Sequence, residues 1–210
     1  MALISTELGS DGCVRLSAPG MPDVTVPQGG GARREVGVWN DRCVAEACGA
    51  EADQWLSAFF GEPCRMVFFP ESSLRPIRRR ADEALGRVGF ADAYPFLLLS
   101  EGSLEDLNAR LPERLPVNRF RPNIVVRGVE PYAEDGWDTF SIGAIPFVVA
   151  KQCVRCVLTT IDQGTAEAGP EPLRTLAAYR RTPDGVVFGV NLAHAAQGVL
   201  GVGDAVVPAA

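Results

Sequence analysis

Residues 145–162 read IPFVVAKQCVRCVLTTID and carry the CxxC pair of the chain, Cys153 and Cys156, at the end of an apolar run. β-branched and aromatic side chains dominate residues 145–150, which predicts a buried strand that leads straight to the two thiols. The β-branched residues that follow predict that the chain continues extended through residues 157–162. The sequence therefore predicts a strand-rich domain with a cysteine pair at a strand end.

The segments around this stretch extend the same pattern. Short strands are expected at residues 124–126 and 139–142, and again at 186–192 and 201–207. Pro172 is expected to open a helix over residues 172–180. Upstream, PFLLLSEGSLEDLNARLP (95–112) predicts a strand, a loop at residues 100–103 and a helix with Ser103 as its N-cap and Asp106 as its capping partner. Such a helix N-terminus favours an anion.

The first third of the chain predicts strands and one helix. Strands are expected at residues 14–16, 24–26, 35–39 and 64–69, with residues 26–35 (VPQGGGARRE) as a glycine-rich hairpin loop. Residues 51–61 change to a helical period that places Ala52, Trp55, Leu56 and Phe59 on one face. The polar, basic residues 71–87 predict a connector between domains 1–70 and 88–210.

These elements predict an α+β fold that is mostly β. The alternation of strands and helices is too irregular for a doubly wound sheet, so we expect a closed or partly closed β-barrel with a few peripheral helices.

Composition limits the classes of function. With 47% hydrophobic residues and a net charge of −6, the 210-residue chain resembles a globular protein and not a nucleic-acid binder. One segment is locally basic: residues 110–127 contain five arginines and one glutamate. Such a local cluster of positive charge suits a small anionic ligand. The sequence has no apolar run of membrane-spanning length and no signal-peptide pattern, so we expect a cytoplasmic protein without a membrane partner.

Cys153 and Cys156 leave several kinds of chemistry open. Lys151 and Arg155 lie beside them, and nearby cations favour the thiolate that binds metals. A structural zinc site is disfavoured because there is one CxxC and one histidine, His194. A thioredoxin-like pair is disfavoured because an extended segment is expected after Cys156. Two buried, inert thiols stay open as an alternative.

The arginine-rich segment LPVNRFRPNIVV (115–126) is the second candidate. If it is extended, Arg119 and Arg121 share one face and Phe120 takes the other. Pro122 biases Arg121 toward an extended conformation. Arginine suits bidentate phosphate binding, but a surface strand with ion pairs to Glu113 or Glu130 explains the pattern equally well.

Two further polar residues favour structural roles. We expect Asp162 to cap a turn with Gly164, although it could also orient a neighbouring side chain. His194 is expected to be a loop or core histidine. The sequence contains no phosphate-binding loop of the GxxxxGK[ST] type and no GxGxxG motif between a strand and a helix.

The order of these motifs resembles one known family. YPFLLLSEGSLEDLNARL, NRFRPNIVV, AEDGWDTFSIG, KQCVRCVLTTID, GPEPLRTLAAYR, VVFGVNL and VGDAV follow one another as in the MOSC domain of mitochondrial amidoxime-reducing components and their bacterial relatives. The resemblance runs from about residue 88 to residue 207. Residues 1–70 resemble the end of the β-barrel domain that precedes MOSC in those proteins.

The resemblance implies a molybdenum-molybdopterin cofactor (Moco). Cys156 would bind the metal and act as the catalytic residue, while Arg121 and the segment 100–103 would hold the cofactor phosphate. A pyridoxal phosphate term is implied only at family level. The implied cofactor-binding residues are Ser100, Glu101, Ser103, Asn118, Arg119, Phe120, Arg121, Cys153, Val154, Arg155, Cys156 and Asn191.

By this resemblance the protein would be an oxidoreductase that reduces N-hydroxylated small molecules by oxygen-atom transfer. An external donor such as a ferredoxin or a flavoprotein would supply the electrons. The alternative is a carrier of sulfur or cofactor, as in sulfurase-type MOSC domains, and a further one is an inactive fragment. The chain lacks the Tyr-Pro-Val-Lys-Ser and Asp-Arg-x-Trp motifs with which larger members begin, so we expect roughly 60 further residues before Met1.

Overall fold

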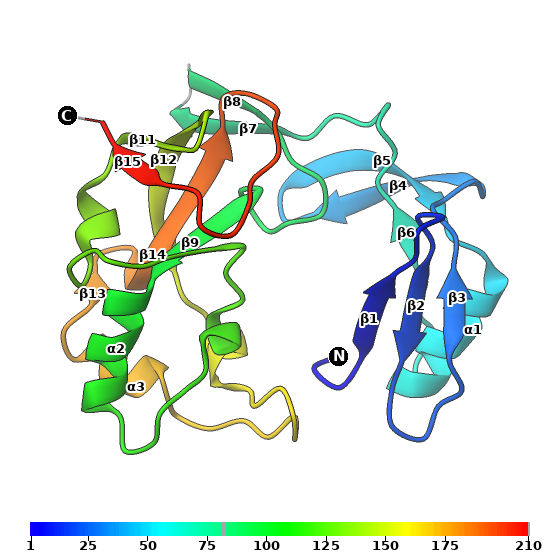
Figure 1. Cartoon of the computed structure of the whole chain (residues 1–210). Coiled ribbons are helices and arrows are strands. Elements are labelled where there is room, and N and C mark those ends of the chain that lie inside the picture. The colour runs from blue at the N-terminus through cyan, green and yellow to red at the C-terminus, as the bar shows by residue number, and fades with distance from the viewer. Residues whose placement is uncertain (81–82, 210) are drawn as a thin grey trace. The chain divides into compact units, whose positions relative to one another are not determined.

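The computed structural model describes residues 1–80 and 83–209, and it divides into two compact units (Figure 1). Met1–Arg75 and Gln163–Ala166 form the first unit. Pro76–Asp162 and the chain from Glu167 onward form the second. No helix among the described residues is long and apolar enough to cross a membrane.

In the first unit, a three-stranded antiparallel sheet packs against one helix. The sheet contains β1 (Ser5–Leu8), β2 (Val14–Ser17) and β3 (Val24–Val26). The helix α1 (Ala50–Phe60) confirms the helical period, because Ala52 and Trp55 are buried and Leu56 and Phe59 pack beside them. Gly61 ends α1 in the left-handed conformation, which glycine adopts readily.

A second sheet of this unit corrects the expected glycine-rich hairpin. β4 (Arg33–Val38) pairs with β5 (Asp41–Ala47) and not with β3, so residues 26–35 connect two different sheets. Gly31 donates its N–H to the carbonyl of Ala47, and a Cβ on Gly31 would lie 2.5 Å from that oxygen. The glycines thus let the chain run close to the end of β5, which is a role that local turn patterns do not reveal.

The third strand of this sheet, β6 (Val67–Phe68), is shorter than the strand expected at residues 64–69. The backbone N–H of Cys64 donates to Ser57 Oγ, and that of Met66 donates to Asp53 Oδ1. The strand is short because side chains of α1 take these backbone groups out of the sheet ladder.

The second unit contains a seven-stranded, nearly closed barrel-like sheet. Along its path the strands are β10 (Ile124–Val126), β9 (Phe96–Ser100), β14 (Gly185–His194), β12 (Ile145–Val154), β11 (Thr139–Ile142) and β15 (Val206–Pro208), with β13 (Arg181–Thr182) beside β14. Only β9 and β10 are parallel neighbours in this sheet. Leu98, Phe147, Val190 and Leu192 are among the residues of its core. The mostly β, α+β prediction is confirmed.

A hairpin occupies part of the expected connector. β7 (Pro76–Arg80) and β8 (Glu83–Arg87) are antiparallel, and Ile77 and Val88 are buried together with Ala193. The sequence did not predict this hairpin, because its charged residues mask the few buried apolar positions.

The helices α2 (Glu101–Arg110) and α3 (Leu173–Ala177) lie beside the sheet of the second unit (Figure 1). Leu107 of α2, Leu176 of α3 and Phe188 of β14 form a second apolar cluster. Three short 3₁₀ helices complete the unit: η1 (Val117–Phe120), η2 (Ala133–Gly136) and η3 (Val157–Thr160). The expectation that residues 157–162 continue extended is therefore wrong. The hydroxyls of Thr159 and Thr160 each donate to the carbonyl three residues earlier in the chain. These bonds favour a helical turn over an extended strand, although both residues are β-branched.

The N-cap of α2 is Ser100 and not Ser103, so residues 101–103 form the first helical turn instead of a loop. Ser100 Oγ accepts the N–H of Ser103 at 3.0 Å and donates to Ser103 Oγ at 2.8 Å. The expected capping partner, Asp106, accepts instead from Arg110 and from the hydroxyl of Tyr132. These bonds lower the pKa of Asp106, while burial raises the pKa of Tyr132.

We expect Ser100→Ala to lower the stability of α2 by about 1–2 kcal/mol, because it removes the cap and leaves buried polar groups unsatisfied. Hydrogen exchange of the α2 amides measures this loss, and Ser72→Ala, at an exposed serine, is the matched control. Equal exchange rates in the two variants would mean that Ser100 does not cap the helix.

Candidate cofactor site

The two cysteines lie in different environments at the end of β12. Cys153 is partly buried within the strand, whereas Cys156 follows the strand and is exposed. Two buried, inert thiols are therefore the wrong description of Cys156. The segment opens a 3₁₀ turn and not an α-helix, so it lacks the geometry of a thioredoxin-like pair. Among the described residues, no group of three or more His, Cys, Asp or Glu side chains could hold a metal ion.

Arg155 joins the cysteine segment to the arginine-rich segment. Its Nη1 donates to Cys153 Sγ at 3.1 Å, and its Nη2 donates to the carbonyl of Phe120 at 2.7 Å. Its guanidinium lies 5.7 Å from the centre of the Phe120 ring. Arg155 Nε is buried and has no hydrogen-bond partner among the described residues. One side chain thus holds together two motifs that are far apart in sequence.

Phe120 supports this junction from the core. Its side chain is 1% exposed and its ring lies 4.6 Å from that of Phe188 on β14. Of the two groups that Phe120 could offer to a ligand, the ring is buried and the carbonyl is bound to Arg155.

The backbone of the arginine-rich segment differs from the extended form that we expected. Residues 117–120 form η1, and Arg121 adopts the left-handed conformation with φ 55° and ψ 46°. The N–H of Arg121 donates to the carbonyl of Asn118 at 3.1 Å. Pro122 favours an extended conformation at the residue before it, so the left-handed conformation of Arg121 departs from the one that the sequence predicts. Arg119 and Arg121 consequently do not share a face.

Arg119 and Arg121 also differ in exposure. Arg119 is buried and its Nη2 lies 2.6 Å from Asp162 Oδ2, whereas Arg121 is exposed. The partner of Arg119 is thus neither Glu113 nor Glu130, and Asp162 orients a neighbour in addition to any role in its turn. Arg119, Thr160 and Asp162 line a cavity of about 320 Å³.

The N-terminus of α2 already faces an acidic side chain of the protein, that of Glu134. Glu134 is fully buried, and its Oε1 accepts from the N–H of Ser100 at 3.2 Å and from Ser103 Oγ at 2.7 Å. Its Oε2 has no partner among the described residues. The hydroxyls of Ser100 and Ser103 are therefore engaged inside the protein. Sequence reasoning missed Glu134, although a helix N-terminus predicts an anion and an acidic 3₁₀ turn could have supplied it.

The other predicted site residues lie at or near the surface, except for one. Glu101, Asn118 and Val154 are exposed, while Asn191 on β14 is partly buried and pairs with Lys151 of β12. The structure thus brings Phe120, Cys153 and Arg155 into contact, and Ser100 and Ser103 form a separate buried group with Glu134.

The available groups fit a cofactor that carries a soft metal and a phosphate. Cys156 offers an exposed sulfur ligand, and Arg121 offers an exposed guanidinium. The unpartnered Nε of Arg155 is a further donor beside the thiols. Cys156 and Arg121 thus expose a thiol and a guanidinium, and Arg155 keeps one buried donor without a partner among the described residues.

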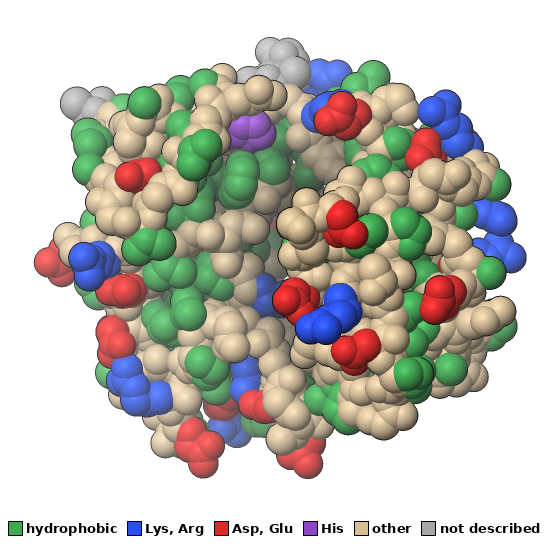
Figure 2. Space-filling view, turned by 45° about the vertical axis from the view of Figure 1, so that its right-hand side comes forward, with side chains coloured by type: hydrophobic (Ala, Val, Ile, Leu, Met, Phe, Trp, Pro, Cys, Tyr) green, Lys and Arg blue, Asp and Glu red, His purple; other side chains and the backbone are tan. Residues whose placement is uncertain are grey.

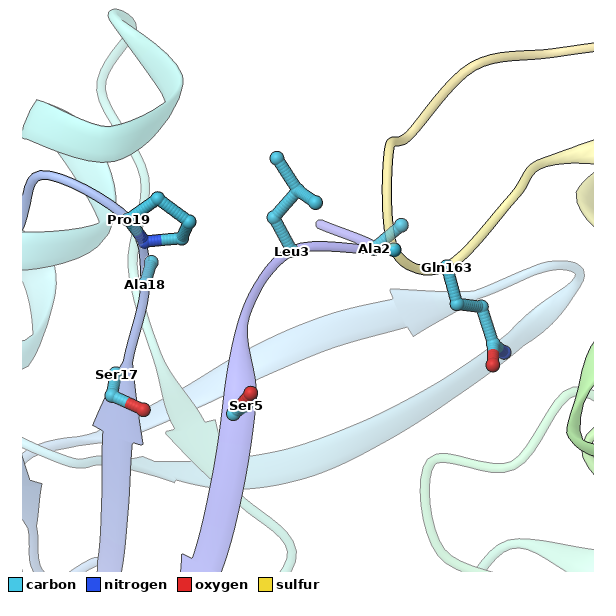
Figure 3. A pocket seen from close by; sticks show the side chains of 8 residues that line it. Ala2, Leu3, Ser5, Ser17, Ala18, Pro19 and Gln163 are labelled. Atoms are coloured by element: carbon cyan, nitrogen blue, oxygen red, sulfur yellow. The ribbon is translucent and has the colours of Figure 1, made fainter.

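Two other features do not suggest a site. A pocket of about 410 Å³ in the first unit is lined by Ser5, Ser17, Gln163 and small or apolar residues, with no ionisable side chain among them (Figure 3). On the face drawn in Figure 2, acidic and basic side chains lie interspersed and form no broad basic patch.

His194 is exposed, and its ring meets that of Phe96 edge-on at 5.6 Å.

The chain is similar to known proteins over most of its length. The chain is 46% identical over 139 residues to mitochondrial amidoxime-reducing component 1 of Mus musculus, and 42% identical over 140 residues to that of Homo sapiens. These matches cover 63% and 64% of this chain and 41% of each relative. Molybdenum cofactor sulfurase of Oryza sativa subsp. japonica is 34% identical over 175 residues, which cover 75% of this chain and 21% of that protein.

Two family models each match one part of the chain. The MOSC N-terminal beta barrel domain matches residues 1–63, and the MOSC domain matches residues 86–207. The expected resemblance is thus confirmed, and the matches cover 41–55% of the length of the amidoxime-reducing relatives. Since the MOSC match alone covers more than half of the residues, the chain belongs to the MOSC domain family.

Proposed function

We propose that the protein is a molybdenum-cofactor oxidoreductase that reduces N-hydroxylated small molecules. The observation that carries the proposal is the exposed Cys156 at the end of β12, next to the Arg155 junction. Family membership and relatives named amidoxime-reducing components support it. The bound cofactor would supply the two-electron chemistry at the N–O bond.

The residues of the chain would bind and orient the cofactor. Cys156 would provide the thiolate ligand of the metal, because a soft sulfur donor suits molybdenum. Arg121 would bind the cofactor phosphate, since it is exposed while Arg119 is paired with Asp162. Arg155 would hold the two segments together through Phe120 and Cys153.

The remaining parts of the proposal are an external electron donor, such as a ferredoxin or a flavoprotein, and a cytoplasmic location. The names of the amidoxime-reducing relatives point instead to mitochondria for those proteins. Pyridoxal phosphate binding stays a family-level prediction.

A carrier of sulfur or cofactor is the second candidate. Relatives named molybdenum cofactor sulfurase match 75–81% of this chain, and the amidoxime-reducing components match 63–81% of it, so both groups of relatives support a candidate function. An exposed thiol such as Cys156 could also accept a persulfide.

We expect Cys156→Ser to abolish molybdenum retention, because a hydroxyl at neutral pH is a poor replacement for a thiolate ligand. Cys153→Ser should only weaken retention, since Cys153 lies within the strand and contacts Arg155. Molybdenum per chain is measured by elemental analysis, with Cys64→Ser in the first unit as control. Equal molybdenum content in wild type and Cys156→Ser would contradict the ligand assignment.

A second experiment separates a reductase from a carrier. We expect the cofactor-loaded protein, given a chemical reductant, to convert benzamidoxime to benzamidine with many turnovers per molybdenum. A carrier instead transfers at most one sulfur or cofactor per chain. Labelled sulfur on Cys156 without multiple turnovers would replace the reductase proposal with the carrier.

A further inference from the structure

Arg121 has an unfavourable backbone conformation at the place where the proposed function needs an exposed guanidinium. A residue other than glycine with φ 55° is uncommon, because its Cβ crowds the following carbonyl. Such a conformation persists only where the surrounding contacts hold it. The question is therefore which contacts hold this turn.

Two contacts fix the residues that precede Arg121. The guanidinium of Arg119, with 9% of its side chain exposed, is 2.6 Å from the carboxylate of Asp162. The carbonyl of Phe120 accepts the hydrogen bond from Arg155 at 2.7 Å, and the Phe120 ring is buried. Both residues before the turn are thus held by side chains that follow β12 or lie at its end.

The Arg119–Asp162 pair differs from an exposed ion pair of the unit in its arginine, because 9% of the Arg119 side chain and 44% of the Asp162 side chain are exposed. Arg114 and Glu105 are 2.7 Å apart, but 64% and 62% of their side chains are exposed, so that pair contributes little to the local structure. A buried guanidinium that loses its carboxylate leaves an uncompensated charge, which is strongly unfavourable. We therefore expect η1 to rearrange when the charge of Asp162 is removed.

We propose that Asp162 is a positioning residue. Through Arg119 it holds the left-handed turn that presents Arg121 to the phosphate of the cofactor. This inference rests on the proposed function only in the identity of the ligand that Arg121 binds.

The test is a double-mutant cycle on cofactor-free protein titrated with inorganic phosphate, followed by the NMR signal of the Arg121 side-chain N–H. Asp162→Asn should raise the Kd about tenfold, and Asp162→Glu should recover most of the affinity. In protein that already carries Arg121→Ala, Asp162→Asn should not change the Kd for phosphate any further. Backbone amide signals report the binding in these variants. Glu105→Gln, which breaks the exposed pair, should leave the Kd unchanged.

Two results would overturn the inference. One is an unchanged Kd in folded Asp162→Asn protein. The other is an effect of Asp162→Asn that persists without Arg121, because a purely structural role predicts such additivity.

A crystal structure of each variant distinguishes failure of the inference from failure of the proposed function. If Arg121→Ala does not alter phosphate binding, the proposed function is wrong in assigning the cofactor phosphate to Arg121. The backbone angle φ of residue 121 in the crystal structures then tests the positioning role of Asp162. This φ should leave the left-handed region in Asp162→Asn and stay there in Asp162→Glu, and a positive φ in both variants would overturn the inference.

Discussion

The contact on which the candidate site depends is the hydrogen bond from Arg155 to the carbonyl of Phe120. It joins residues 35 positions apart in the sequence and brings the cysteine segment next to the arginine-rich segment. The same guanidinium contacts Cys153, so one planar side chain with several donors fixes both segments. β12 and β14 form the frame for this contact, because Phe120 packs on Phe188 of β14 while Arg155 follows β12.

The charged side chains of this region differ in whether they are paired inside the protein or exposed to solvent. Arg119 is neutralised by Asp162, and the N-terminus of α2 is occupied by Glu134. The exposed cation at the end of η1 is Arg121. The serines that the sequence suggested as phosphate donors are instead bound to Glu134, so in the proposed function the anion contact rests on Arg121.

The sequence predicted those parts of the fold that depend on local periodicity. The face of α1 with Ala52 and Trp55, and the strand that leads to Cys153, follow from the spacing of apolar residues. The cap of α2, the conformation of Arg121 and the path of residues 26–35 were missed. The cap is a local contact between Ser100 and Ser103. The other two features depend on contacts distant in sequence, which are Arg155 and Asp162 for Arg121 and Ala47 for the glycines. The cysteine and arginine motifs were found from the sequence, but the contacts that join them were not.

The central claim is that Cys156, and not Cys153, is the protein ligand of molybdenum in the loaded protein. X-ray absorption at the molybdenum edge tests it most directly when selenocysteine replaces each cysteine in turn. We expect molybdenum–selenium scattering in the Cys156→selenocysteine protein and none in the Cys153→selenocysteine protein. Scattering from position 153 instead, or from neither position in a protein that contains molybdenum, would contradict it.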